Sequence, residues 1–500
     1  MKLNTLWRSL APWVCLFVMS GVGGIAAQDS SGGELLEVVD VVRLVLNADP
    51  ALQRTERNVE VARNDYEITK AATIPDLSLE ITPYPYDRRN TPIGPSVEDV
   101  ETHSAGVGLQ LDQALPTSGS ISASLDHRVS VRDNGDRTVE QNPELALGFS
   151  QPLFAGRAPV DGIVFNAGRR NAEIAYSRAE YADESQRNTS VMNALSGFVL
   201  VAELRRSVDV LERTIDVLGR QIEAAELDRS QGLLSDNAVL ALQVTLNERR
   251  EALFDTQLAL LQAEQNLARL LGREDLESVR IAETFSVPPV PSVRDLNRAI
   301  QDNPSVRSAR LGVEQAEQRG ILNDISEKPR LSLRVNVSPE YPTERADPSD
   351  PAASFSDLFE SDASVATNVS VGLTIPLLTA RERSYRERTD ELLRENAQTL
   401  ADDTELATAN RMRTLETKQR FLQRRLELLV TEVEYQQRRL RNERDLLEAG
   451  VATELRVDEV ELDLISRRNE QQQVQAELFL NAVDILATVG EDVSEILLTD

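Results

Sequence analysis

The chain has 500 residues, of which 27% are charged and only 4% are aromatic, and its formal net charge is −28. This composition is typical of long helices with narrow apolar seams rather than of several compact cores. The acidic excess disfavours a nucleic-acid partner, because such partners are held largely by basic side chains. With one Cys and two His in the chain, His103 and His127, we expect no metal site and no cofactor.

The first residues predict an export signal. After a weakly basic start, the run from Leu10 to Val22 is mostly apolar, and Ala26-Ala27 offers small residues for cleavage. Because this run is too short for a spanning helix, we interpret residues 1–27 as a secretory signal peptide, with an uncleaved membrane anchor as the alternative. Cleavage would remove Cys15, so the exported protein would not rely on disulfides. No later stretch approaches eighteen consecutive apolar residues, so insertion into a membrane would require a closed β-barrel.

Several segments of the sequence occur twice, in the same order. Asp49-Pro50 recurs as Asn303-Pro304, 254 residues later, and Gly232 recurs as Gly450, 218 residues later. Such self-similarity indicates internal repeats. We therefore expect a first repeat over residues 28–286, a second over residues 287–490, and a C-terminal tail over residues 491–500.

Prolines mark where the pattern changes within each half. Pro75 and Pro329 are expected to end helices, because Pro disfavours helical geometry in the residue before it. Pro152 and Pro376 are expected to mark the return from strands to helix. Between these points apolar residues alternate with small or polar ones, as in Val107–Leu111, which predicts four strands in the first half and two in the second.

Gly and Ser on the alternate face of these strands suit a barrel wall with one side in lipid and the other facing a wet lumen. A half-buried sheet of a soluble protein is the alternative. Residues 84–102, with several prolines and charges, and residues 339–363, with seven acids, are predicted to be solvated loops.

Long helical segments follow the strands in each half. Apolar residues recur at spacings of three and four, as in Val201, Leu204 and Val208, and again in Leu422, Leu426 and Leu429. A sustained 3.5-residue repeat predicts a coiled-coil seam. About 65 helical residues would reach roughly 100 Å, far more than a bilayer, so most of the helix must stand in water.

Both long helices are predicted to end in a tight hairpin. Gly232 and Gly450 suit the left-handed geometry that ends a helix. Three residues later, Ser235 and Thr453 can cap the return helix, and Asp236 and Glu454 complement its dipole. Plain capping chemistry explains these residues as well as a partner-binding role does, and both interpretations stay open.

Taken together, the signal peptide, the duplicated halves, the strand-end Pro-Leu-Phe and the Gly-x-x-Ser/Thr tips resemble the TolC outer-membrane efflux channel family over nearly all of the mature chain. The resemblance implies an α+β membrane protein: a trimeric transmembrane β-barrel continued by a long periplasmic α-helical coiled-coil barrel, built from two internal repeats. It also implies a homotrimer in the outer membrane, in contact with outer-membrane lipid, that extends into the periplasm. Such a channel is not an enzyme, and it works with a periplasmic adaptor and an inner-membrane pump of the RND, ABC or MFS type.

The same resemblance assigns roles to particular residues. Adaptor docking falls on the hairpin tips, namely Gly232, Leu233, Ser235, Asp236, Gly450, Val451 and Thr453. An acidic pore constriction falls on Glu459, with Asp458 or Glu454 nearby. Arg456 and Ala238 stand where the family has acids, and Leu447 stands where some members place a gate-locking Tyr, so this chain departs from the family pattern there.

The resulting prediction is a passive duct of tripartite efflux or of type I secretion. A ring of acids would attract cations and repel anions, while each acid taken singly also fits a solvated helix face. The alternative function is a periplasmic coiled-coil scaffold without a pore, which would need no strands with a lipid-compatible face. A hydrolase is disfavoured, because the acids form no recognisable catalytic arrangement.

Overall fold

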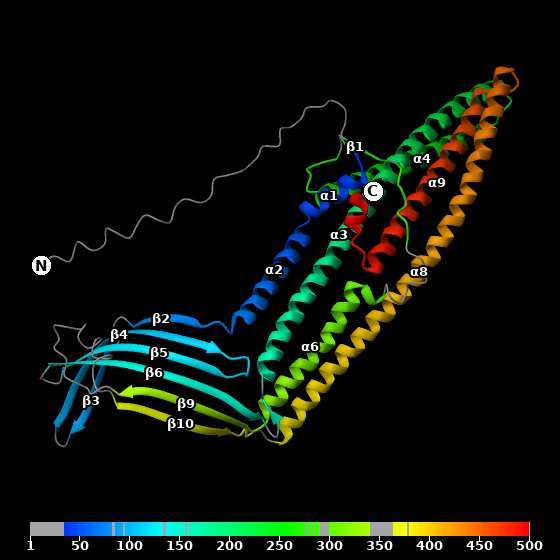
Figure 1. Cartoon of the computed structure of the whole chain (residues 1–500). Coiled ribbons are helices and arrows are strands. Elements are labelled where there is room, and N and C mark those ends of the chain that lie inside the picture. Colours follow the sequence, from blue (N-terminus) through cyan, green and yellow to red (C-terminus); the bar gives the residue numbers. More distant parts are fainter. Residues whose placement is uncertain are drawn as a thin grey trace, which may run out of the picture.

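In the computed structural model of the chain, residues 35–499 are described, apart from residues 83–85, 94–95, 134–136, 156–157, 161, 277–278, 283, 291–299, 341–363 and 378–379. The predicted signal peptide lies outside the described residues, as does most of the acidic loop predicted over residues 339–363. A sheet forms one end of the molecule and long helices extend from it (Figure 1). Among the described helices, none is both long enough and apolar enough to cross a membrane.

Two helices dominate the structure, and the others pack along them. The long ones, α3 and α8, have 68 and 69 residues and are each roughly 100 Å long at 1.5 Å per residue. The described helices are α1 (Val38–Ala48), α2 (Pro50–Ala71), α3 (Ile163–Ser230), α4 (Asp236–Leu270), α6 (Pro304–Glu327), α8 (Ala380–Glu448), α9 (Glu454–Val489) and α10 (Val493–Thr499).

The helices form four columns side by side. Along α3, α4 and α2 follow one another, and along α8, α9 and α6 do the same (Figure 1). Because α3 also contacts both α6 and α9, the order of the columns is α2/α4, α3, α6/α9 and α8. Column α2/α4 and column α8 are therefore the two edges of this helical wall.

Glycines permit the close approach where one helix of a column follows another. Gly272 has φ +66°, and a Cβ there would lie 2.8 Å from the Cβ of Ala48. Gly490 has φ +87°, and a Cβ there would lie 2.7 Å from the carbonyl oxygen of Asp302. Both positions combine left-handed backbone with a tight contact, so only Gly fits.

An Asp-Pro or Asn-Pro pair starts the helix of each of these two columns that lies nearer the sheet, α2 and α6. Asp49 accepts a hydrogen bond from the Ala51 N–H at 2.8 Å, and Pro50 occupies the first turn of α2. At the other junction Asn303 accepts from the Ser305 and Val306 N–H groups at 2.9 and 3.2 Å. These side chains satisfy helix N–H groups that have no partner within the helix.

The main sheet is antiparallel, in the order β10-β9-β6-β5-β4-β2, with β3 paired to β4 and β7 paired to β6. Four strands of this path come from the first half and two from the second, the numbers that the alternation predicts. A separate small sheet pairs β1 with β8. The strands are β1 (Leu35–Leu36), β2 (Asp76–Thr82), β3 (Tyr86–Ile93), β4 (Ser96–Ala114), β5 (Ser120–Asp133), β6 (Arg137–Ala155), β7 (Ala158–Pro159), β8 (Arg280–Ile281), β9 (Arg330–Glu340) and β10 (Ser364–Thr374).

The prediction of a solvated loop over residues 84–102 is wrong. These residues form β3 and the first part of β4, paired from Tyr86–His103 to Ile93–Ser96. Backbone hydrogen bonds hold this ladder, and they do not depend on apolar side chains. Proline and charge content therefore did not predict where these strands end.

Alternation gives the sheet two chemically different faces. One face carries apolar rows across paired strands, for example Leu79 opposite Leu109, and Leu333 opposite Val371. The other carries small and polar residues, such as Ser122 opposite Gly148. The apolar side chains of the two end strands, Leu77, Leu79 and Ile81 of β2 and Val365, Val369, Val371 and Leu373 of β10, are exposed in the single chain.

Three of the four predicted helix–strand prolines lie between a helix and a strand. Pro75 lies between α2 and β2, Pro329 between α6 and β9, and Pro376 between β10 and α8. Pro152 is different: it lies within β6, where the pairing with β9 shifts between Pro152 and Phe154. Its assignment to the junction is therefore wrong. A proline has no N–H for the ladder and is tolerated in a sheet at such an irregularity.

The largest core lies where α1, α3, α4, α9 and α10 meet. Phe285 packs there against Phe198, with ring centroids 6.0 Å apart, and against Phe479 at 5.6 Å. Val493 and Leu497 of α10 are buried in the same core. The segment predicted as a C-terminal tail thus contributes a packed helix.

Candidate functional site

The first hairpin tip turns through Gly232, which has φ +76°. The Leu233 N–H donates to the Asp228 carbonyl at 2.9 Å, and the Gly232 N–H donates to the Arg229 carbonyl at 2.9 Å. This pattern ends α3 with its last carbonyls satisfied. Ser235 precedes α4 in extended backbone but makes no side-chain capping hydrogen bond, and the Leu233 side chain is 72% exposed.

At the second tip the same turn is built at Gly450, with φ +73°. The Val451 N–H donates to the Leu446 carbonyl at 2.8 Å, and the Val451 side chain is 74% exposed. Unlike Ser235, Thr453 caps its helix, because its hydroxyl accepts from the Arg456 N–H at 3.3 Å. The two tips therefore share a backbone turn and each present one apolar side chain to solvent.

The difference between the two caps can be measured directly. Thr453→Ala is expected to cost about 1 kcal/mol of local stability, because the cap of α9 is lost. Ser235→Ala is the matched control and should cost less, since its hydroxyl caps nothing. Amide hydrogen exchange at Arg456 and Ala238 reads the two effects separately. Equal acceleration at both tips would contradict the assignment.

The predicted acids lie just inside the second tip, and basic groups accompany two of them. Arg220 of α3 is 2.5 Å from Asp458, and Arg456 is 2.8 Å from Glu459. Glu454 is exposed at the start of α9. The hydrogen bond from Arg456 to Glu459 raises the pKa of that guanidinium, so it stays charged. The structure therefore brings Asp458 and Glu459 into a mixed cluster with two arginines.

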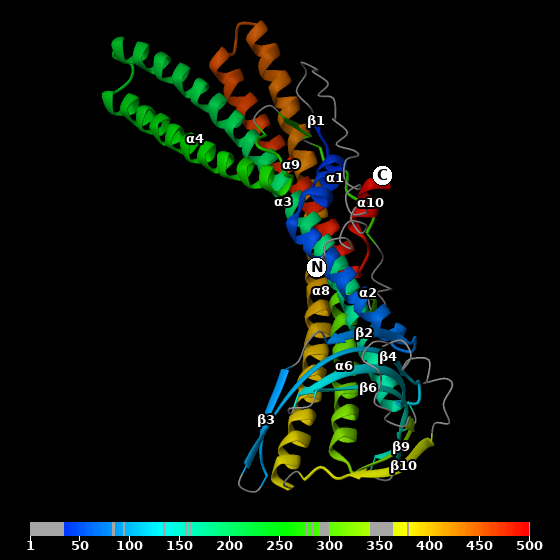
Figure 2. The same ribbon diagram turned by 90° about the vertical axis from the view of Figure 1, so that its left-hand side faces the viewer.

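This cluster also joins the two helical hairpins. Gln221 of α3 donates to Glu459 of α9 at 3.1 Å, next to the Arg220–Asp458 pair. Lower on the same pair of helices, Arg206 donates to Gln472 at 3.0 Å. The hairpins diverge beyond their shared lower part (Figure 2). Polar contacts between α3 and α9 therefore link the two hairpins below their tips, which lie apart in Figure 2.

The outer edge of α8 carries an apolar stripe that the sequence interpretation missed. Phe421, Leu428 and Tyr435, spaced seven residues apart, are 65%, 67% and 63% exposed. The seam predicted on the same helix is different: Leu422, Leu429 and Val433 are buried inside the chain. A second heptad series beside the first was the signal that could have revealed this edge.

The opposite edge of the wall carries a matching stripe. On α4, away from α3, Leu240, Val244, Phe254, Leu258 and Leu261 are all exposed, and on α2 so are Val61 and Ile68. At the sheet end, β2 and β10 are likewise the two ends of the hydrogen-bonded path. Each edge of the chain thus combines an end strand with an apolar helix face.

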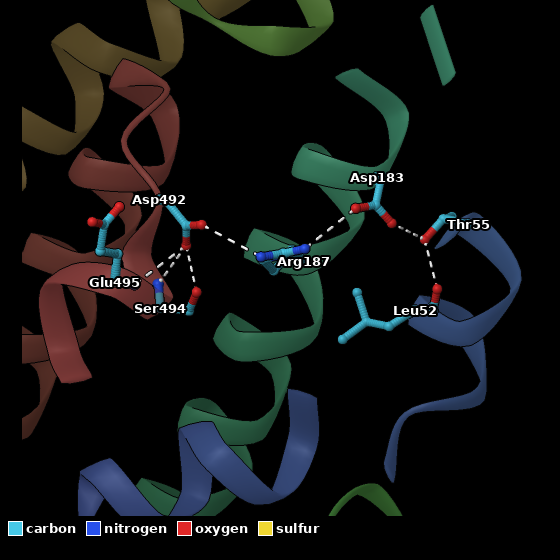
Figure 3. A network of polar contacts seen from close by, with 7 residues as sticks. All are labelled: Leu52, Thr55, Asp183, Arg187, Asp492, Ser494 and Glu495. Atoms are coloured by element: carbon cyan, nitrogen blue, oxygen red, sulfur yellow. Dashed lines mark hydrogen bonds and ion pairs between the residues drawn. The ribbon is translucent and has the colours of Figure 1, made fainter. Parts of the chain in front are cut away.

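A network of polar contacts fixes the C-terminal segment to the helical wall (Figure 3). Arg187 of α3 lies 3.7 Å from Asp492 on one side and 3.5 Å from Asp183 on the other. Asp183 accepts from the Thr55 hydroxyl of α2 at 2.6 Å. The network therefore joins the C-terminus to both the first and the second column.

The two histidines lie within the sheet. His103 is paired in β4 opposite Val131, and His127 in β5 opposite Val107. In the part of the chain that the structure describes, no group of three or more His, Cys, Asp or Glu side chains could hold a metal ion.

The chain resembles several solved structures of outer-membrane proteins. It is similar to the outer membrane protein VceC of Vibrio cholerae, with a TM-score of 0.59 and 15% identity over 91% of this chain and 96% of that chain. The open state of the MtrE outer membrane channel of Neisseria gonorrhoeae gives a TM-score of 0.61 and 14% identity, covering 91% and 89%. The CmeC outer membrane channel of Campylobacter jejuni gives 0.62 and 12%, covering 91% and 85%. The chain has the fold of these outer-membrane channels.

The family match agrees with the fold. Residues 296–491 match the family model of outer membrane efflux proteins. This confirms the resemblance to the TolC-like outer-membrane efflux channel family, whose members are transport channels and not enzymes. No match was found among curated proteins.

Proposed function

We propose that the chain is the outer-membrane channel of an efflux system, a passive exit duct that works as a homotrimer. The observation that carries the proposal is the pair of open edges. The edge at β2, α2 and α4 and the edge at β10 and α8 are different surfaces of one chain, and both are apolar. Contacts of this head-to-tail kind generate closed rings when the rotation closes.

In such a ring, β10 of one copy pairs with β2 of the next, and the α8 stripe packs on the α2/α4 stripe. Closure of the ring would pair the free backbone N–H and C=O groups of the two end strands. It would also bury the exposed apolar side chains of the helical stripes. The sheet would then be a barrel with its apolar face in outer-membrane lipid and its polar face lining the lumen. The helical wall would continue this duct through the periplasm.

The two halves of the chain share local structure, as internal repeats in this assembly would. Gly272 packs on Ala48 as Gly490 packs on Asp302, and the turns at Gly232 and Gly450 share their hydrogen bonds. Two similar units per copy would give a ring of six pseudo-equivalent hairpins. Repeats over residues 28–286 and 287–490, followed by a packed C-terminal helix, are therefore part of the proposal.

The hairpin tips are the proposed docking site for a periplasmic adaptor, which would connect the channel to an inner-membrane pump of the RND, ABC or MFS type. Leu233 and Val451 support this role, because exposed apolar side chains at the end of a long helical duct favour a protein contact. The complex would export small molecules or, in type I secretion, polypeptides. A scaffold without a pore is less favoured, since it would not need the two-faced sheet.

Site-specific crosslinking tests this function. Leu233→Cys and Val451→Cys, in a chain whose one native Cys lies in the predicted signal peptide, are expected to capture a periplasmic adaptor, identified by mass spectrometry. Leu377→Cys is the matched control, because that leucine is 93% exposed at the sheet end. Equal capture at Leu377, or capture of cytoplasmic enzymes alone, would count against docking at the tips.

The cluster at Asp458 and Glu459, with Glu454 nearby, is the proposed pore constriction. Asp458→Asn with Glu459→Gln should reduce the preference for cations in planar bilayers, because a ring of three copies loses its negative charge. Arg220→Gln with Arg456→Gln is the converse variant and should raise that preference. Reversal potentials in a KCl gradient measure both. Unchanged potentials in both variants would remove the cluster from the pore.

A further inference from the structure

A cavity of about 420 Å³ lies beside the point where α9 ends and α6 begins. Four helices contribute to its lining: Asn193 and Ser196 come from α3, Ser305 from α6, Thr408 and Arg411 from α8, and Asp484 from α9. It is formed by one chain, from the second, third and fourth columns of the wall, and it opens to solvent where Asn193 and Ser196 are exposed. It is therefore separate from the hairpin tips and from both open edges.

Most of the lining is polar and uncharged. Nine of its fourteen residues are Ser, Thr or Asn, and none is aromatic. Hydroxyl and amide groups both donate and accept hydrogen bonds. The two charged residues neutralise one another, since Arg411 donates to Asp484 at 2.8 Å. The cavity thus offers many neutral donors and acceptors and little net charge.

Buried polar residues hold the frame of this cavity. Asn188, Asn303 and Thr488 are only 5%, 8% and 7% exposed. The Asn303 amide donates to the Thr488 carbonyl at 3.0 Å, and the Asn188 amide donates to the Glu491 carbonyl at 3.1 Å. Because the Asn188 and Asn303 side chains are fixed by these partners, a ligand would meet a surface that is already ordered.

The cavity lies at the break between α9 and α6, the two helices of the third column. Such a break does not by itself require a polar lining. The corresponding break lies between α4 and α2. There, counted at the sequence offsets of 218 and 254 residues, Leu270 stands for Thr488 and Ala51 stands for Ser305. At these two positions the polar lining of the α9–α6 junction is replaced by apolar residues at the other junction.

We propose that this cavity binds a neutral polyhydroxylated solute of about mono- or disaccharide size. Sugar and polyol hydroxyl groups match a lining that both donates and accepts, and the volume falls within the usual range of small-molecule pockets. A free ion would have to displace the Arg411–Asp484 pair, and an aromatic compound would find no ring to stack on. The proposal adds a ligand site in the wall and does not depend on the pore.

Saturation-transfer NMR with trehalose tests the site on the full-length protein, purified in a detergent without a sugar head group. The wild type is expected to transfer saturation to trehalose. Thr408→Val with Asn193→Leu should weaken binding about tenfold or more, because two polar partners are lost. Ser196→Phe, which fills the cavity from an exposed position, should abolish transfer.

Thr399→Val with Asn64→Leu makes the same chemical changes at exposed positions outside the cavity and should bind trehalose as the wild type does. Sodium gluconate is the charged counterpart and should bind more weakly than trehalose. The proposal is overturned by absence of transfer to trehalose in the wild type, by equal signals from the wild type and the cavity variants, or by preferential binding of gluconate.

Discussion

A chain carrying Phe421→Asp and Leu428→Asp is expected to remain monomeric. These are two of the three positions of the α8 stripe, and both side chains are about two-thirds exposed in the single chain. Burial of each such side chain between copies would stabilise the assembly by roughly 1.5–3 kcal/mol. The variant would lose this contribution at all three equivalent interfaces of the trimer. A carboxylate buried there without a partner would add several kcal/mol of desolvation penalty. Loss of assembly should therefore be complete, as measured by light scattering in detergent and by absence of conductance.

Gln423→Asp with Val430→Asp is the matched control for this variant. It also adds two carboxylates seven residues apart on α8, but about 200° round the helix from the stripe at 3.6 residues per turn. Both residues are exposed, so this variant should still assemble. Monomers from both variants would point to a general effect of charge, and assembly of the Phe421/Leu428 variant would exclude the α8 stripe from the interface.

The periodic elements of this fold could be predicted from the sequence because their signals are local. Gly232 and Gly450 mark the ends of the long helices, since left-handed backbone strongly favours Gly. Likewise, alternation between apolar and small residues identifies strands such as β9 and β10. These features depend on neighbours within a few residues, so one sequence is enough to find them.

The missed features depend on contacts between distant segments. Pro152 looked like the end of a strand, yet β6 continues because the register with β9 shifts around it. Arg220 is 238 residues before Asp458, and no local pattern couples them. The apolar stripe of α8 is visible in the sequence as a seven-residue repeat. Its role as an outer edge could be inferred only once the structure showed that the other apolar series of α8 packs against α9. Sequence reasoning thus found the elements more reliably than the surfaces between them.

Asn188→Leu is expected to detach the C-terminal segment from the wall. The Asn188 amide donates to the Glu491 carbonyl at 3.1 Å and accepts from the Val493 N–H at 3.2 Å. Leu would leave both backbone groups unpaired in a buried position, at about 1–3 kcal/mol each. Because Val493 and Leu497 belong to the main core, their release would also expose apolar surface of α1. Lower thermal stability and rapid carboxypeptidase digestion of residues 491–500 are the expected results.

Thr189→Val tests whether this effect is specific to the buried amide. Thr189 is the next residue along α3, is exposed, and donates only to the Ser185 carbonyl one turn earlier in the same helix. Its loss should change stability by no more than about 0.5 kcal/mol, and the C-terminal segment should stay resistant to digestion. If the Asn188 variant kept the same resistance, the polar network around Arg187 and Asp492 would be sufficient to hold the segment, and the amide would not be its main anchor.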